Sequence, residues 1–187
     1  MRGKIIIAGT GRAGTSFLVR LLTRLDIDTG WNRNVDGFIP SIRAGCEIQW
    51  GSDHHNIPPS PEWLETAPRI IKSPYLSRHL TALVEQGTKI DHVIIPIRDL
   101  DDATNSRLNA GLSWFSEDFE EEKRNLTETL AKCTNDCDMF QIPRTFLRFP
   151  QHVKDVDYAF VEMAKVFPEL DRERFVAEFD QLNRERL

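Results

Sequence analysis

The sequence has little cysteine and lacks any long hydrophobic run. Its three cysteines, Cys46, Cys133 and Cys137, do not form an even set for disulfides, and no histidines lie near Cys133 and Cys137 to complete a zinc site. No stretch approaches the ~20 apolar residues of a membrane-spanning helix, and the apolar run at residues 5–8 is too short for a secretory signal. We therefore expect a cytoplasmic protein that binds neither a membrane nor a metal ion.

An excess of basic residues is also absent. The 24 Lys and Arg residues face 29 Asp and Glu residues, and the resulting net charge of −5 argues against general binding to nucleic acid. We find no internal repeat, low-complexity tract or linker in the 187 residues, so the sequence predicts one domain over residues 1–187. With 40% apolar residues, such a domain has enough material for a substantial core.

The most informative stretch runs from Lys4 to Leu25. Three consecutive isoleucines suit a buried strand, three glycines interrupt it, and apolar residues then recur at helical spacing. A strand, a glycine-rich turn and a helix together form an anion-binding cradle, because glycines let N–H groups approach an oxyanion and the helix N-terminus adds its positive dipole end. Thr15 and Ser16 add two hydroxyl donors to this cradle.

The turn departs from the Walker A motif in an informative way. Thr15 stands where the nucleotide-binding lysine is expected, and the nearest cation is Arg12 inside the loop. The segment G-T-G-R-A-G-T-S-F-L instead resembles the 5′-phosphosulfate loop of sulfotransferases, in the branch with G-x-x-R-[SA]-G-T-[ST]. This resemblance implies binding of 3′-phosphoadenosine 5′-phosphosulfate, with Arg12 facing the sulfuryl group. The residues of the loop that it assigns to the cofactor are Gly9, Gly11, Arg12, Ala13, Gly14, Thr15 and Ser16.

The rest of the chain alternates strands with helices. This alternation predicts a three-layer α/β fold with a parallel sheet of about four to five strands, helices on both faces and ligands at the carboxyl ends of the strands. By resemblance it is the P-loop NTPase-like sulfotransferase fold. The expected strands after the first are Arg69–Lys72, Asp91–Ile97 and Thr145–Phe149. After the first helix, one helix is expected to start at Leu76 and to stop at Gly87. The other expected helices span Asp101–Ala110, Ser116–Lys132, Val153–Val166 and Asp171–Leu182.

Three local features carry further structural expectations. Pro96 favours a strand end or a sheet edge, Ser116 is the expected N-cap of its helix, and the acidic run Glu117–Glu122 is expected on a solvated helix face. The segment 26–68, rich in Gly, Pro, Asn and Asp, predicts an irregular insertion. It is either the wall that binds the acceptor, or its tryptophans cover the edge of the sheet.

A second motif follows the third expected strand. Arg98 ends the strand and Ser106 lies eight residues later, a spacing that resembles the sulfotransferase signature for the 3′-phosphate of the cofactor. An arginine fork and a serine hydroxyl suit a phosphate group. This chain has Asp99-Leu100 where sulfotransferases often have Asp-Pro. Read alone, Asp99 also fits a Walker B carboxylate, although the loop lacks the accompanying lysine.

The catalytic groups are less clearly marked. Lys72 in K-S-P resembles the K-D-P segment of bacterial sulfotransferases, which implies that it neutralises the bridging oxygen during transfer. A general base is also required. Glu47 is the first candidate, followed by His54 or His55 and then Asp36. The C-terminal R-K-G-x-x-G-x-W signature of cytosolic aryl and steroid sulfotransferases is absent.

The sequence thus predicts a sulfotransferase that acts on a hydroxyl or amine of a small-molecule or glycan acceptor. Two alternatives remain: a small P-loop kinase, and a catalytically silent module that binds a nucleotide or an anionic partner.

Overall fold

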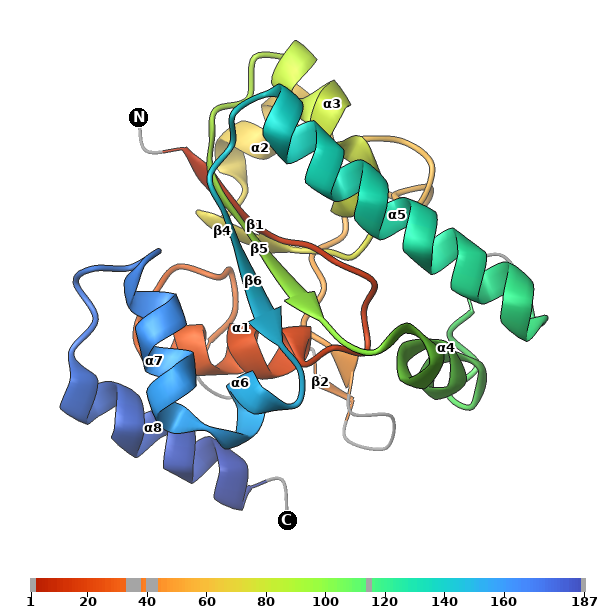
Figure 1. The fold of residues 1–187 in the computed structure, drawn as a ribbon. Helices are drawn as coiled ribbons and strands as arrows, with labels where there is room; N and C mark the ends of the chain where they lie inside the picture. The colour runs from red at the N-terminus through yellow and green to blue at the C-terminus, as the bar shows by residue number, and fades with distance from the viewer. Residues whose placement is uncertain (1–2, 33–37, 40–43, 114–115, 186–187) are drawn as a thin grey trace.

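A four-stranded sheet forms the centre of the computed structural model, which describes residues 3–32, 38–39, 44–113 and 116–185 (Figure 1). All its strand pairs are parallel, and the strand order is β4-β1-β5-β6. The strands are β1 (Lys4–Ile7), β4 (Ile70–Lys72), β5 (Ile90–Ile97) and β6 (Arg144–Arg148).

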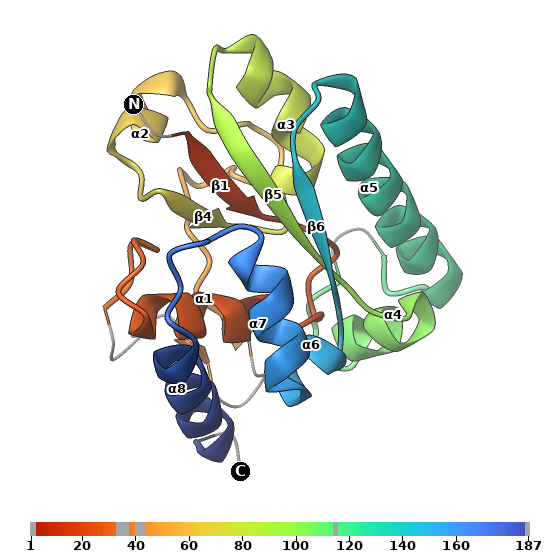
Figure 2. The ribbon, with the colours of Figure 1, turned by 60° about the vertical axis from the view of Figure 1, so that its left-hand side comes forward.

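Helices cover both faces of this sheet, because successive side chains of a strand point to opposite faces. Ile5 and Ile7 of β1 belong to one apolar core, whereas Ile6 and Ala8 belong to the other. The first core is covered by α1 (Thr15–Arg24), α7 (Val156–Ala164) and α8 (Arg172–Arg184). The second is covered by α2 (Pro61–Thr66), α3 (Leu76–Glu85) and α5 (Phe119–Met139), on the opposite side of the sheet (Figure 2). The predicted three-layer α/β fold is confirmed.

The strand order creates a topological switch point between β1 and β5. From β1 the chain passes to β4 on one side, and from β4 it crosses to β5 on the other side of β1. In open parallel sheets, ligands bind in the crevice outside the carboxyl ends of strands at such a point. The glycine-rich loop follows β1, and Arg98 with α4 (Leu100–Leu108) follows β5, so both predicted motifs lie at this crevice.

Two helix boundaries differ from expectation. Asp118, not Ser116, is the N-cap of α5, because its carboxylate accepts the N–H of Glu121 at 2.9 Å. Ser116 acts in the preceding turn, where its hydroxyl accepts the N–H of Asp118. The helix also continues past Lys132 to Met139, since Cys133 and Cys137 keep it packed on the second core.

The expected helix at residues 153–166 is in fact two helices. Asp155 separates α6 (Gln151–Lys154) from α7, and its carboxylate accepts the N–H of Tyr158 at 3.0 Å. Pro96 is the residue before the last one of β5, so of the two expected positions the strand end holds; the edge does not, because β5 is internal. The missing N–H is tolerated because β1 pairs with β5 only as far as Ile94.

The segment 26–68 contains more structure than expected. It includes α2 and a small antiparallel pair, β2 (Phe38–Ile39) and β3 (Ala44–Gly45). Trp31 packs against the first core, and Trp50 and Trp63 pack against the second with their ring centroids 5.9 Å apart. Across the parts of the chain that the structure describes, no helix is both long and apolar enough to cross a membrane.

Gly14 is the tightest point of the loop, and its replacement by alanine should destabilise the fold more than the same change at Gly87. Both glycines have a left-handed backbone, with φ of 80° and 83°. That conformation costs a residue with a Cβ about 1–2 kcal/mol at either position. At Gly14 the Cβ would also lie 2.6 Å from His152 Nε2, whereas nothing lies within 4 Å at Gly87.

Overpacking should add about 1–3 kcal/mol for Gly14→Ala. Urea unfolding of both variants measures the difference. Equal losses of unfolding free energy would show that α6 does not confine the loop.

Candidate functional site

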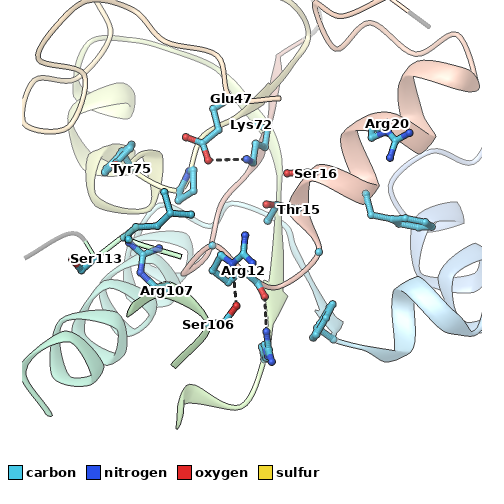
Figure 3. Close-up of a pocket in the computed structure, with 18 of the residues that line it drawn as sticks. Arg12, Thr15, Ser16, Arg20, Glu47, Lys72, Tyr75, Ser106, Arg107 and Ser113 are labelled. Carbon is cyan, nitrogen blue, oxygen red and sulfur yellow. Dashed lines mark hydrogen bonds and ion pairs between the residues drawn. The ribbon is translucent and has the colours of Figure 1, made fainter. Parts of the chain in front are cut away.

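A pocket of about 610 Å³ lies at the switch point (Figure 3). Most of the predicted site residues line it: Gly11, Arg12, Gly14, Thr15, Ser16, Glu47, Lys72, Arg98 and Ser106. Gly9 and Ala13 do not line it; Ala13 is buried, and the backbone of Gly9 lies against β5. The topology therefore brings together residues from four separate stretches of the sequence.

The loop presents an uncapped helix N-terminus to the pocket. The first N–H groups of a helix have no acceptor within the helix. At α1 the N-cap is Gly14, no side chain among the described residues caps these groups, and the first turn holds no acidic residue. By contrast, aspartates cap α4, α5, α7 and α8. The start of α1 can therefore receive an anion from the pocket.

Three hydrogen bonds with neighbouring helices hold this loop. The N–H of Gly9 donates to Ser77 Oγ at 2.8 Å, and the same hydroxyl donates back to the Gly9 carbonyl at 3.1 Å. Arg107 Nη1 donates to the Thr10 carbonyl at 2.9 Å. The loop backbone is thus fixed from α3 and from α4.

Arg98, Ser106 and Arg12 meet at one side of the pocket. Arg12 Nε donates to Ser106 Oγ at 3.0 Å, and Arg98 Nη1 donates to the Arg12 carbonyl at 3.3 Å. The Arg98 guanidinium lies over the Phe149 ring, 4.9 Å from its centroid, and no described group is bonded to its buried Nε. Burial, with the neighbouring charges of Arg98 and Arg107, lowers the pKa of Arg12.

Lys72 and Glu47 form an ion pair at the opposite side. Lys72 Nζ donates to Glu47 Oε1 at 2.8 Å and to the Gly45 carbonyl at 2.9 Å. Ser16 Oγ donates to the same carbonyl at 2.8 Å. The Lys72 side chain is only 3% exposed, and burial lowers its pKa despite the nearby Glu47. Lys72 is therefore a fixed group of the pocket wall and not a solvated strand-end lysine.

The other base candidates lie elsewhere. The rings of His54 and His55 are tilted by 34° with centroids 4.0 Å apart, and His55 packs edge-on against Tyr75, which lines the pocket. Neither histidine lines the pocket itself. Asp36 falls outside the described residues. Among the described candidates, Glu47 alone lines the pocket, which keeps it first.

The sequence reasoning missed Arg107 and Glu122. Arg107 lines the pocket, and its Nε donates to Glu122 Oε1 at 2.7 Å. Glu122 is completely buried, so its expected place on a solvated helix face was wrong. The position of Glu122 within the acidic run does not indicate its burial, because its partner Arg107 belongs to another helix.

Arg20, Tyr75, Phe149 and Glu185 also line the pocket without having been predicted. A signal existed for Arg20, which follows Ser16 by four residues and therefore lies on the same face of α1. Tyr75 follows Lys72 by three residues, whereas Phe149 and Glu185 come from distant parts of the chain and reach the pocket only through the fold.

No protein-family model matches the chain, and no curated protein matches it either. The chemistry of the pocket must therefore be judged from its own residues. Five of the lining residues are cations (Arg12, Arg20, Lys72, Arg98 and Arg107), and two, Glu47 and Glu185, are carboxylates. In a chain with a net charge of −5, this is a local site for anions.

Glu122→Gln should be strongly destabilising, because it leaves the buried Arg107 charge without its carboxylate. We expect a loss of about 3 kcal/mol in unfolding free energy. Asp101→Asn is the matched control, since it breaks the exposed pair of Asp101 with Lys123, the residue next to Glu122. That variant should lose less than about 1 kcal/mol. Chemical denaturation of the two variants makes the comparison, and similar losses would mean that Glu122 is not needed to neutralise Arg107.

Proposed function

We propose that the protein is a sulfotransferase that moves a sulfuryl group from 3′-phosphoadenosine 5′-phosphosulfate to a hydroxyl or amine of a small-molecule or glycan acceptor. The observation that carries this proposal is the meeting of two anion-binding groups in one pocket. The arginine-bearing loop at the start of α1 and the Arg98–Ser106 pair are joined there by hydrogen bonds through Arg12.

The free hydrogen-bonding capacity of these residues fits the two ends of the cofactor. Ser106 accepts a hydrogen bond from Arg12, so its own hydroxyl proton remains available for a phosphate oxygen. Arg98 has a buried Nε to which no described group is bonded. These groups suit the 3′-phosphate, whereas the N-terminus of α1 suits the 5′-phosphosulfate.

The opposite wall would supply the groups that act during transfer. Glu47 would take the proton of the acceptor hydroxyl as the acceptor oxygen bonds to sulfur and the bond from sulfur to the bridging phosphate oxygen breaks. Lys72 has three N–H donors and uses two of them in the described contacts, so one remains for that bridging oxygen. Arg12 would stabilise charge on the equatorial oxygens of the sulfuryl group.

The kinase alternative is less well supported. Asp99 would have to hold magnesium, but its carboxylate accepts the N–H of Asp102 at 3.0 Å and so caps α4. Thr15 also occupies the place of the phosphate-binding lysine. A silent binding module would need neither the Lys72–Glu47 pair nor a base, and activity measurements distinguish that alternative.

We expect 3′,5′-adenosine bisphosphate to stabilise the protein without magnesium, by roughly 2.7 kcal/mol at a hundred times its dissociation constant. Arg98→Ala should weaken this binding by about 1.5–3 kcal/mol and leave adenosine 5′-phosphate binding nearly unchanged. Arg148, which ends the adjacent strand β6 and does not line the pocket, provides the control variant. Titration calorimetry gives the affinities. Stabilisation seen only with ATP and magnesium would favour the kinase.

Lys72→Met should lower the rate of sulfuryl transfer by about 10²–10³-fold, the scale for loss of one electrostatic stabiliser. Binding of 3′,5′-adenosine bisphosphate should change little, because this product carries no sulfuryl group. Lys4→Met is the control: Lys4 also lies on a strand, but its ammonium binds the carbonyls of Ala67 and Pro68 outside the pocket. Turnover is measured with radiolabelled sulfate on an acceptor found by screening. Unchanged turnover would remove Lys72 from the chemistry.

A further inference from the structure

A second group of charges lies one helical turn along α1 from Ser16. Arg20 Nη2 and Glu185 Oε2 are 3.1 Å apart, and both residues line the pocket. Arg24 Nη2 donates to the same carboxylate at 2.6 and 2.7 Å. One carboxylate is thus shared by two arginines at the edge of the pocket.

The two arginines form the fixed part of this arrangement. Their side chains are 14% and 12% exposed, compared with 37% for Glu185. Burial lowers the pKa of Arg20, and the neighbouring charge of Arg24 lowers it further. Half-buried guanidiniums that repel each other need an anion nearby.

Glu185 supplies that anion from an unfavourable position. It directly follows the last residue of α8, where the negative end of the helix dipole disfavours a carboxylate. The arginines offset this cost: the hydrogen bond from Arg24 is the first cause of the lowered pKa of Glu185, and the charges of Arg24 and Arg20 lower it further. An anion of a ligand that entered the pocket would meet the same guanidinium of Arg20 without that cost.

Arg20 also lies on the side of the pocket where the chemistry is proposed. It follows Ser16 by four residues, a rise of about 6 Å along the helix. Cys46 is a buried residue on this side of the pocket. Burial raises the pKa of its thiol to about 11, whereas the charges of Lys72 and Arg20 both act to lower that pKa. The charges of Lys72, Glu47 and Arg20 thus all act on Cys46. Ser106 lies across the pocket from Lys72 and Glu47 (Figure 3).

We propose that Arg20 binds a carboxylate of the sulfuryl acceptor, which replaces Glu185 as its counterion. This inference rests on the proposed function and specifies it: the acceptor is a hydroxyl compound that bears a carboxylate. Its hydroxyl meets Glu47 and Lys72 while its carboxylate meets Arg20. Glu185 keeps its contacts with Arg24 during the exchange. A neutral acceptor would leave the Arg20–Glu185 ion pair intact, and its affinity would not increase through a contact with Arg20.

Matched pairs of hydroxyl compounds test this inference. The protein is saturated with 3′,5′-adenosine bisphosphate and titrated with glucuronate and glucose, glycerate and glycerol, and 4-hydroxybenzoate and 4-hydroxybenzamide. We expect at least one carboxylate to bind about tenfold more tightly than its neutral partner, the scale of one charge-assisted hydrogen bond. Arg20→Gln should abolish this preference, and Arg20→Lys should keep part of it, since it retains the charge.

The variants of the displaced carboxylate give the second readout. Glu185→Gln should raise the affinity for the carboxylate about three- to tenfold, because the competing anion is gone. Glu178→Gln is the control, as Glu178 lies 3.7 Å from Arg24 but does not line the pocket. If Glu185→Gln only lowers the melting temperature and leaves the carboxylate affinity unchanged, the pair merely attaches α8 to α1 and the inference is wrong. The absence of a preference within every pair would also overturn it.

Failure of the proposed function gives a different result. If 3′,5′-adenosine bisphosphate does not bind, the sulfotransferase proposal fails, and titration of the nucleotide-free protein still shows whether Arg20 selects carboxylates. If the nucleotide binds but no carboxylate is preferred, only the Arg20 inference fails.

Discussion

Close contact between the glycine-rich loop and its neighbours is the constraint on which the site depends. A Cβ at Gly9 would lie 2.9 Å from the carbonyl oxygen of Pro96 in β5, and one at Gly14 would lie 2.6 Å from His152 in α6. Any side chain at either position would therefore push the loop away from the carboxyl edge of the sheet. The start of α1, with the hydroxyls of Thr15 and Ser16, would move with it. The missing side chains determine where the polar groups of the pocket stand.

The protein must also hold several cations in one pocket although its net charge is negative. Three of them have a carboxylate at 3.1 Å or closer: Arg107 has Glu122, Lys72 has Glu47 and Arg20 has Glu185. Arg98 is 3.7 Å from Asp102, and its guanidinium lies over an aromatic ring. The positive charge of Arg98 is thus balanced less closely than the charges of Arg107, Lys72 and Arg20. An anion that binds there relieves repulsion as well as forming hydrogen bonds.

Much of the fold could be read from local patterns, because β1, β4 and β5 are short runs rich in isoleucine and valine and each motif follows a strand end. The same logic placed Arg12, Lys72 and Arg98 at one edge. It could not find Glu122, since burial of that carboxylate depends on Arg107 from another helix. Nor could it find Glu185, because only the packing of α8 on α1 brings it to the pocket. The wrong helix start at Ser116 and the missed helix boundary within residues 153–166 have one cause. Several aspartates and serines could serve as N-caps there, and the sequence does not show which of them accepts the helix N–H.

The Gly45 carbonyl accepts hydrogen bonds from both Ser16 and Lys72, and this shared acceptor couples the positions of the two side chains. A single peptide carbonyl holds a hydroxyl of α1 and an ammonium of β4. A rotation of that peptide would release both donors in the same movement. β3 ends at Gly45, and Glu47 follows two residues later. A movement of this backbone would therefore also shift the Glu47 carboxylate. The inserted segment thus holds polar groups of α1 and β4 in place at the carboxyl edge of the sheet.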